Sequence, residues 1–309
     1  MRERTRRLRP VEGLCLALGA FAACGPAPRN FDETRAFEHL LTQVHFGARV
    51  PGSEAHTRQY DWMRQHLEMT ADRVSEHTFA AISPLDSTNV EYRSLIAVFN
   101  EKSPRRVLFG AHWDCRAFAD EETDPELRKL PVPGANDGAS GVAVLLEIAS
   151  QLKERPPEIG VDLAFFDGED QGLHGDPRSW SLGSQRFVKD HPQYRPAFAV
   201  ILDMIGREGT RIPREGNSMM ASSALVERIW ELGRLSGSKV LADSTGRAVF
   251  DDHIPFLEAG IPAVDLIDME DPVWHTTKDL PEHCSPESLG EVGRLVQEII
   301  RRAEKDLSP

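Results

Sequence analysis

The sequence predicts an α/β fold in which helices cover both faces of a largely parallel sheet. Segments of strand character alternate along the chain with segments of helical periodicity; AFAVIL is apolar at every position and VDLAFF at every position but Asp162. Strands that are apolar throughout are typical of parallel sheets buried on both faces. With 309 residues, 40% of them hydrophobic, the chain can bury one large core.

The first 23 residues have the features of a signal peptide. MRERTRRLRP holds five arginines, and the apolar run VEGLCLALGAFAA that follows is too short to span a membrane. Ala-Ala-Cys at residues 22–24 resembles a bacterial lipobox, which predicts cleavage before Cys24 and a lipid anchor on it; a plain secretory signal is the alternative. We therefore expect a lipid-anchored or secreted protein on the periplasmic side of a bacterial cell envelope. Residues 24–35 are expected to form a tether and residues 36–309 a single domain.

The first half of this domain is predicted to contain two helices and three strands. FDETRAFEHLLTQVHFG is amphipathic, and a Pro-Gly turn leads into a second helix with Tyr60, Met63 and Leu67 on one face. Three runs with alternating or continuous apolar character then predict strands, namely RVSEHTFAA, VEYRSLIAVF and RRVLFGA.

The second half continues the alternation of helices and strands. ASGVAVLLEIASQLKE repeats apolar residues at helical spacing, whereas VDLAFFDGED and AFAVILDMIG are predicted strands that end in acids. A helix is expected at SALVERIWELGRLSG and a strand at IPAVDLI. The closing helix, CSPESLGEVGRLVQEIIRRAEK, has Ser285 as its predicted N-cap and Pro286 at its first position.

Charge and cysteine content limit the partners and the chemistry. A formal net charge of −13 would repel nucleic acid and anionic lipid, so we expect neither as a partner, and any membrane contact is expected through Cys24 alone. Cys115 and Cys284 are the cysteines outside the first 24 residues. They could form a disulfide in an oxidising compartment or remain two buried thiols, and both alternatives stay open.

Three predicted strands end in carboxylates: VLFGAHWD, LAFFDGED and AVILDMIG. Ligands of open α/β sheets bind outside the carboxyl ends of the strands, so these acids should meet at one place. A cation would relieve their repulsion, and His112 and His275 supply imidazoles for a mixed nitrogen and oxygen zinc site. Taken singly, each acid could instead be a helix N-cap or turn residue, as Asp137 in GANDGASG could be.

These segments resemble the zinc aminopeptidase and glutaminyl cyclase superfamily. The shared motifs, in the family's order, are GARVPGSEAH, GAHWD, GANDGASGVAVLLEIA, FFDGED, GSQRF, LDMIG, DDHIPFLEAGIPA and VWHTTKD. The resemblance implies a three-layer α-β-α sandwich around a central mixed, largely parallel twisted sheet, as in zinc exopeptidases.

The resemblance also implies roles for individual residues. Asp137, Asp170 and His275 match the ligands of one zinc, and Glu169 matches the general acid/base. In di-zinc aminopeptidases Asp137 would bridge to a second metal that His112 and Asp203 also hold. The family has a Glu-Glu pair where this chain has Glu169 and Asp170, so one ligand is a methylene shorter.

Two activities occur on this scaffold, and three features favour the cyclase. Trp274 precedes His275; DDHIPFLEAGIP matches the cyclase version of its segment, in which Asp252 would hydrogen bond with Asp203; and Trp180 could form a pocket wall. Animal cyclases place a tryptophan directly after the position of His174, where this chain has Gly175. Whether Asp251 or Asp252 contacts Asp203 stays open.

The expected function is therefore a zinc-dependent glutaminyl-peptide cyclotransferase with one zinc per chain. Its substrates would be peptides or proteins with an N-terminal glutamine, which it would convert to pyroglutamate with release of ammonia. The alternative is a metallo-aminopeptidase with two zinc ions. A catalytically silent relative is not expected, because every ligand position holds a competent residue.

Overall fold

The structure, a computed structural model, describes residues 31–307. The expected signal peptide, Cys24 and most of the expected tether lie outside these residues. Within the described part of the chain, no helix is both long and apolar enough to cross a membrane.

The folded domain begins before residue 36. Phe31 is buried, and its ring lies against Gly293 of the closing helix α7 (Pro286–Leu307). Asp32 then caps helix α1 (Glu33–His45) by accepting a hydrogen bond from the backbone N–H of Arg35. The prediction that a tether extends to residue 35 is therefore wrong, because residues 31–35 are held by a buried ring and a capped helix.

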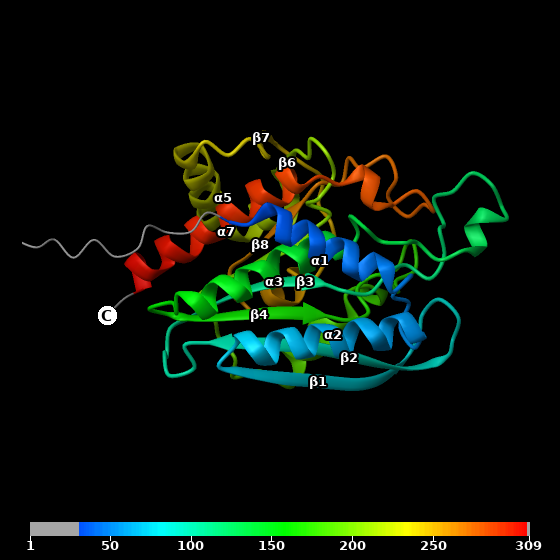
Figure 1. The fold of residues 1–309 in the computed structure, drawn as a ribbon, viewed down its shortest axis with the longest axis horizontal. Helices are drawn as coiled ribbons and strands as arrows, with labels where there is room; N and C mark the ends of the chain where they lie inside the picture. Colours follow the sequence, from blue (N-terminus) through cyan, green and yellow to red (C-terminus); the bar gives the residue numbers. More distant parts are fainter. Residues whose placement is uncertain (1–30, 308–309) are drawn as a thin grey trace, which may run out of the picture. The chain divides into compact units, whose positions relative to one another are not determined.

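A six-stranded sheet forms the middle layer, with the strand order β1-β2-β4-β3-β5-β8 (Figure 1). Antiparallel pairing joins β1 to β2 and β2 to β4, whereas β4, β3, β5 and β8 run parallel to one another. The predicted mixed, largely parallel sheet is confirmed. The strands are β1 (Arg73–Ile82), β2 (Asn89–Phe99), β3 (Arg106–His112), β4 (Gly160–Phe166), β5 (Ala199–Asp203) and β8 (Ala263–Ile267).

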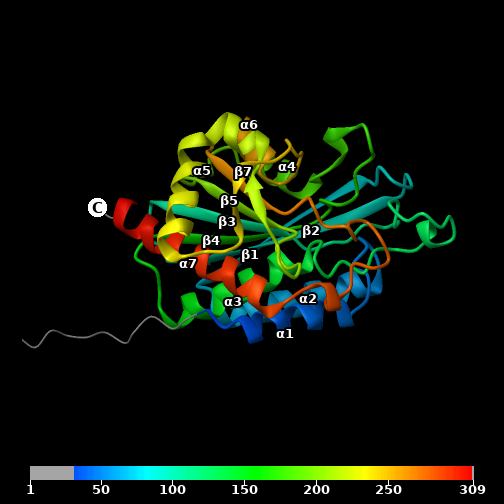
Figure 2. The ribbon, with the colours of Figure 1, turned by 90° about the horizontal axis from the view of Figure 1, so that it is seen from above.

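Helices cover both faces of this sheet, which gives the predicted three layers (Figure 2). One face packs on α1, α7, α2 (Glu54–Thr70) and α3 (Ala139–Glu154), and the other packs on α4 (Leu182–Asp190) and α6 (Ile254–Glu258). Strand β4 contributes to both cores by alternation, with Leu163 and Phe165 facing the first and Ala164 and Phe166 the second. This two-sided burial explains why the strand is apolar except at Asp162, whose buried carboxylate pairs with Arg106.

Helix α5 (Gly216–Ser236) contacts β8 and α7 and begins earlier than its apolar pattern predicts. Glu215 caps it by accepting hydrogen bonds from the backbone N–H groups of Asn217 and Ser218. Its backbone is non-helical at Ser222, so the first turns and the predicted segment are two helical pieces joined at a kink. The closing helix begins as predicted, with the Ser285 hydroxyl accepting from the Ser288 N–H.

The remaining elements are short. A second sheet pairs β6 with β7, and three single 3-10 turns lie in loops. Their bounds are β6 (Ile212–Arg214), β7 (Leu241–Thr245), η1 (Leu127–Lys129), η2 (Pro177–Ser179) and η3 (Pro281–His283).

Candidate active site

The candidate site lies beyond the carboxyl ends of the parallel strands β3, β4 and β5. His112 is the last residue of β3 and Asp203 the last of β5, while Glu169 and Asp170 follow β4 after a short turn. A cavity of about 250 Å³ opens there. Its lining includes the carboxylates of Asp137, Glu169, Asp170, Asp203 and Asp251, together with Trp180, Trp274 and His275.

Asp137, Asp170 and His275 form the first group that could hold a metal. One ligand atom from each lies within 4.8 Å of the others. The Nε2 atom of His275 is 3.0 Å from Asp170 Oδ1 and 3.7 Å from Asp137 Oδ2. The second oxygen of Asp170 is buried and has no hydrogen-bond partner. The structure thus brings together the three residues that match the ligands of one zinc. One of their carboxylate oxygens, Asp170 Oδ2, has no hydrogen-bond partner and could bind a metal.

A second group shares Asp137 with the first. The Nε2 atom of His112 is 3.0 Å from Asp137 Oδ1 and 3.1 Å from Asp203 Oδ1. In this group too, one ligand atom from each residue lies within 4.8 Å of the others. The Oδ1 atom of Asp137 thus faces His112, and its Oδ2 atom faces His275. A bridging carboxylate would need this arrangement.

The electrostatics of the two groups suit a divalent cation. Burial, then the charge of Asp170, raises the pKa of Asp137 to about 6. Burial alone would lower the pKa of His275, but Asp170 and Asp120 raise it to about 9. The raised pKa values mean that Asp137 and His275 bind protons that offset the negative charge of the cluster. A bound cation would displace these protons. Imidazole nitrogen with carboxylate oxygen is a donor set that zinc accepts.

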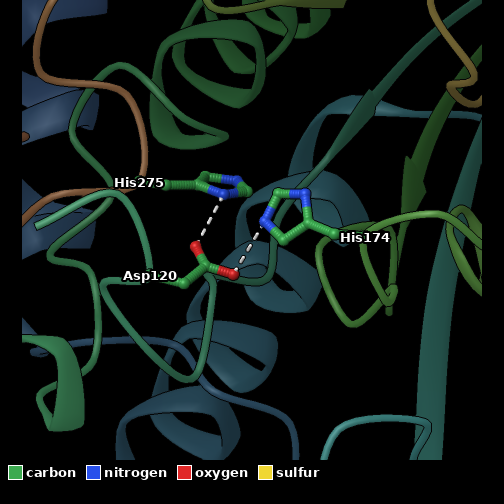
Figure 3. Close-up of side chains that lie close together, drawn as sticks. All are labelled: Asp120, His174 and His275. Atoms are coloured by element: carbon green, nitrogen blue, oxygen red, sulfur yellow. Dashed lines mark hydrogen bonds and ion pairs between the residues drawn. The ribbon is translucent and has the colours of Figure 1, made fainter.

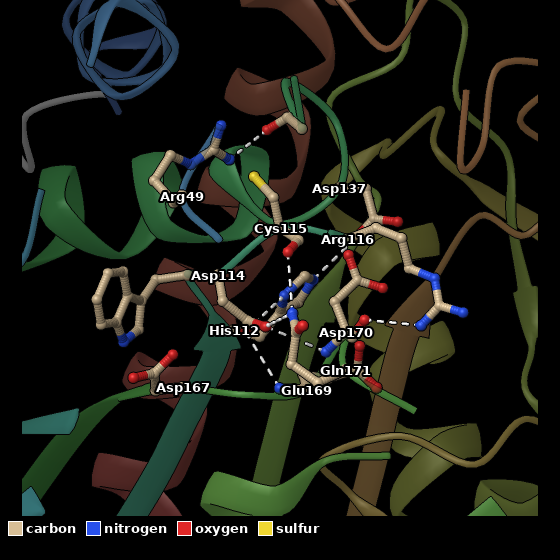
Figure 4. A network of polar contacts seen from close by, with 12 residues as sticks. Arg49, His112, Asp114, Cys115, Arg116, Asp137, Asp167, Glu169, Asp170 and Gln171 are labelled. Atoms are coloured by element: carbon tan, nitrogen blue, oxygen red, sulfur yellow. Dashed lines mark hydrogen bonds and ion pairs between the residues drawn. The ribbon is translucent and has the colours of Figure 1, made fainter. Parts of the chain in front are cut away.

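Buried acids behind the site hold its loops in place. The Asp114 carboxylate accepts hydrogen bonds from the backbone N–H groups of Glu169 and Asp170 and from the Gln171 side chain (Figure 4). Asp279 accepts in the same way from the N–H groups of Asn136 and Asp137. Sequence reasoning did not assign Asp279, although it closes the VWHTTKD motif, because a residue that holds backbone has no signature of its own.

Glu169 points to a different part of the cavity from Asp170. Glu169 is buried and accepts a hydrogen bond of 3.1 Å from the hydroxyl of Ser181. Burial, then the charge of Asp251, raises the pKa of Glu169 well above its ordinary value. The turn that presents it contains Gly168, whose φ of +75° favours glycine and whose missing side chain leaves room for Tyr92.

Asp251, and not Asp252, faces the cavity. Asp252 is fully buried and accepts a hydrogen bond of 2.5 Å from Ser184. Its hydrogen bond with Ser184 holds Asp252 outside the residues that line the cavity, so of the two acids that the sequence left open the structure favours Asp251 as the neighbour of Asp203. Asp251 lies among the cavity residues instead, where its charge acts on both Glu169 and Asp203. Sequence places both acids in one turn but does not tell which of them faces inward.

Trp180 and Trp274 form two walls of the cavity. The Trp274 ring stacks on His275 with centroids 3.9 Å apart, and the Trp180 ring lies nearly parallel to the same imidazole at 5.9 Å. Both indoles are half-buried, so they line the cavity and are not core residues. Trp180 reaches the cavity from beyond Gly175, which itself lies at the cavity edge.

Cys115 and Cys284, the cysteines of residues 31–307, are free thiols. Both are buried, and burial is the main cause that raises the pKa of each thiol. The alternative of two buried thiols is confirmed, and the disulfide alternative is wrong for this structure.

Comparison with known proteins gives matches over most of the chain. Residues 94–300 match the model of peptidase family M28. Aminopeptidase YwaD of Bacillus subtilis is 32% identical over 67% of this chain and 43% of its own length. The chain spans about half the length of the curated bacterial relatives that it matches, 51% and 43%.

Solved structures match the fold closely. The glutaminyl cyclase of Bacteroides thetaiotaomicron is 33% identical, covers 89% of this chain and 99% of its own, and gives a TM-score of 0.84. A Zn-dependent exopeptidase from Parabacteroides distasonis is 34% identical with the same coverage and a TM-score of 0.85. Both likenesses extend over nearly the whole described part of the chain.

Proposed function

The chain belongs to peptidase family M28, and from this membership we propose that it is a zinc-dependent glutaminyl-peptide cyclotransferase. Its substrates are peptides or proteins with an N-terminal glutamine, and its products are the pyroglutamyl peptide and ammonia. The observation that carries the proposal is the pair of indoles, Trp180 and Trp274, whose rings both stack on the ring of His275 and line the cavity. The likeness to a solved glutaminyl cyclase over 89% of the chain supports it.

The cavity fits the N-terminal end of such a peptide. Trp180 and Trp274 offer apolar walls for the methylene groups of glutamine, and they keep water from the reacting carbonyl. Glu169, Asp203 and Asp251 offer carboxylates to the α-amino group. Apolar walls beside the reacting carbonyl favour attack by this amine over attack by water.

One zinc per chain fits the first donor group, Asp137, Asp170 and His275. When bound there, zinc supplies a Lewis acid that polarises the side-chain carbonyl of the glutamine. The residues around it do the remaining work. Asp114 and Asp279 fix the loops that carry the ligands, and the shared carboxylate of Asp137 is oriented by its own backbone N–H bond to Asp279.

Glu169 carries the proton in the proposed reaction. As the α-amine forms a bond with the side-chain carbonyl carbon, it gives one proton to the Glu169 carboxylate. Glu169 then gives this proton to the side-chain nitrogen as the old carbon–nitrogen bond breaks, and ammonia departs. Proton transfer by a positioned carboxyl group accelerates such steps by about 10²–10⁴-fold.

The alternative function, a di-zinc aminopeptidase, has one observation in its favour. Asp137 directs one oxygen to each donor group, and His112 and Asp203 complete the second group. In the cyclase proposal this second group is a support, in which His112 hydrogen bonds with Asp203 and fixes the acid that faces the substrate amine.

The two functions differ in what they release. We would incubate the purified protein with a glutamine-initiated peptide and, separately, with leucine and alanine anilides. The cyclase releases ammonia from the first and no free amino acid or aniline from any of them. Release of the terminal residue would instead establish the aminopeptidase, and two tightly bound zinc ions per chain would agree with it.

The proposed location is the periplasmic side of a bacterial envelope, through a lipid on Cys24. The arginine-rich start, the short apolar run and the Ala-Ala-Cys sequence support this. Expression of the full chain in a bacterial host should label it with a radioactive fatty acid, and Cys24→Ser should abolish the label. An unlabelled wild-type chain would favour a plain secretory signal.

A further inference from the structure

Asp120, in the loop after β3, joins two histidines at the edge of the cavity (Figure 3). Its Oδ1 atom lies 3.1 Å from Nδ1 of His275, and its Oδ2 atom lies 3.1 Å from Nε2 of His174. His275 uses its other nitrogen, Nε2, toward Asp170 and Asp137. Asp120 therefore occupies the side of the imidazole opposite to the donor group.

The same loop holds the backbone around His275. His275 has a φ of +54°, a left-handed conformation that a side chain disfavours, so neighbouring contacts must maintain it. The backbone N–H of Glu121 donates to the carbonyl of His275. Glu122 accepts hydrogen bonds from the N–H and the hydroxyl of Thr277. Asp120, Glu121 and Glu122 thus all hydrogen bond with the segment that contains His275.

Arg116 fixes Asp120 to the rest of the site. It is nearly fully buried, and its guanidinium pairs with Asp120. The same group donates to the backbone carbonyls of Asp170 and Gly172, at 2.8 and 2.7 Å, and lies 4.6 Å over the Trp180 ring. One buried cation therefore connects the partner of His275, the backbone of the ligand Asp170 and a wall of the cavity.

We propose that Asp120 is a positioning residue for the zinc-binding imidazole of His275, with Arg116 holding Asp120 in place. Asp120 accepts a hydrogen bond from Nδ1–H, which would leave the lone pair of Nε2 directed at the metal and fix the plane of the ring. A carboxylate on the far nitrogen of a ligating histidine also strengthens that ligand. This inference rests on the zinc site of the proposed function but not on the reaction performed there.

The test measures zinc affinity, not turnover. Asp120→Ala and Asp120→Asn would be titrated with zinc against a competing chelator, beside the wild type. The alanine variant should bind zinc about 10- to 100-fold more weakly. The asparagine variant should lose less, because its amide oxygen can still accept from Nδ1. A matched control is Glu126→Gln, an exposed acid of the same loop that pairs only with Lys129 within the described chain.

A second readout separates positioning from a general loss of structure. With cobalt in place of zinc, the visible absorption bands of Asp120→Ala should shift, because the imidazole is free to rotate, and those of Asp120→Asn should return toward the wild type. Melting temperatures of the metal-free proteins would report the fold itself.

Zinc affinities of all three variants within about twofold of the wild type, with unchanged cobalt spectra, would overturn the inference and leave the cyclase proposal standing. Conversely, an aminopeptidase product would overturn the proposed function without touching this result.

Discussion

Two adjacent residues, Glu169 and Asp170, have different tasks in this site. Asp170 faces His275 and has an unpaired buried oxygen, whereas Glu169 hydrogen bonds with Ser181 and lines another part of the cavity. In the turn after β4 the two side chains point to different partners, which separates metal binding from proton transfer. Each task can therefore be removed without the other.

Glu169→Gln should abolish turnover and leave zinc bound. The amide keeps the size and the hydrogen bond of the side chain but cannot carry a proton, so kcat should fall at least about 10²-fold. Steady-state kinetics with zinc analysis of the dialysed protein measures both quantities. A variant with a near-normal kcat would show that another group carries the proton.

Asp251→Asn and Asp252→Asn should differ in kind. Asp251 faces the cavity, so its variant should lose activity at nearly unchanged stability. Asp252 is fully buried and bonded to Ser184, so its variant should mainly lose stability, by about 1–3 kcal/mol. Kinetics and urea denaturation of both variants give the comparison. The reverse pattern would restore Asp252 as the acid that acts on substrate.

Sequence reasoning found the residues that end strands and missed those that act through loops. The convergence of strand ends predicted one acidic site, the resemblance implied Asp137, Asp170 and His275 as its zinc ligands, and the structure brings these three together. Asp120 and Arg116 lie in an irregular loop whose path depends on tertiary contacts. The sequence left the choice between Asp251 and Asp252 open for a similar reason, because no periodic pattern tells which residue of a turn points into a cavity.

At the scale of elements, α1 and α2 bring two half-buried histidines into ring contact. His39 of α1 contacts the rings of Trp62 and His66 of α2, and its Nε2 atom has no hydrogen-bond partner. Burial, then the charge of His66, lowers the pKa of His39 to about 3. In the folded protein His39 therefore stays neutral at pH values at which the unfolded chain, with an ordinary histidine pKa of about 6.5, binds a proton there.

Because of this lowered pKa, the free energy of unfolding should decrease as the pH is lowered from about 6.5 to 3. In that window the unfolded state binds more protons at His39, so acidification favours unfolding, by about 1.4 kcal/mol for each pH unit. Between pH 7 and 5, the free energy of unfolding of His39→Gln should therefore decrease by about 2 kcal/mol less than that of the wild type. Urea denaturation of the metal-free proteins measures this difference. Equal losses in the two proteins would contradict the role of His39.

The start of α1 gives a second prediction at this scale. Phe31→Ala should lower the free energy of unfolding by about 3 kcal/mol or more, because the ring is buried against α7. The exposed neighbour Thr34→Ala should change it by less than about 0.5 kcal/mol. Urea denaturation compares the two variants. If Phe31→Ala were as mild as the control, residue 31 would belong to a tether after all.

The elements themselves were mostly predictable, and their exceptions have local causes. Continuous apolar runs identified β3, β4 and β5, and Ser285 with Pro286 marked the start of α7. The beginning of α5 was missed because Glu215 caps a polar turn, and the kink at Ser222 separates this turn from the periodic segment.

At the scale of the molecule, the sheet gathers the site from segments far apart in sequence. The parallel run β4-β3-β5-β8 places His112, Asp170 and Asp203 at one edge, and the loop before α3 adds Asp137. The alternation of strands and helices predicted this parallel region. The antiparallel pairing of β1 and β2 came only from the resemblance to a family with a mixed sheet.

Zinc should stabilise this arrangement as a whole. Ligand at 100 times its dissociation constant adds about 2.7 kcal/mol to the native state. A chelator should therefore lower the melting temperature of the wild type, and excess zinc should restore it. Asp170→Ala should show no such shift and no turnover, because it removes a ligand. A wild-type melting temperature that ignores the chelator would contradict a zinc site at this edge of the sheet.

The most direct test of the proposed function follows the side-chain nitrogen of the substrate. A peptide whose N-terminal glutamine carries an isotopic label in its side-chain amide would be incubated with the zinc-loaded protein and examined by mass spectrometry. The cyclase proposal predicts that all of the label appears in ammonia and that the peptide keeps every residue but loses one ammonia in mass. Labelled free glutamine together with a peptide shortened by one residue would contradict it.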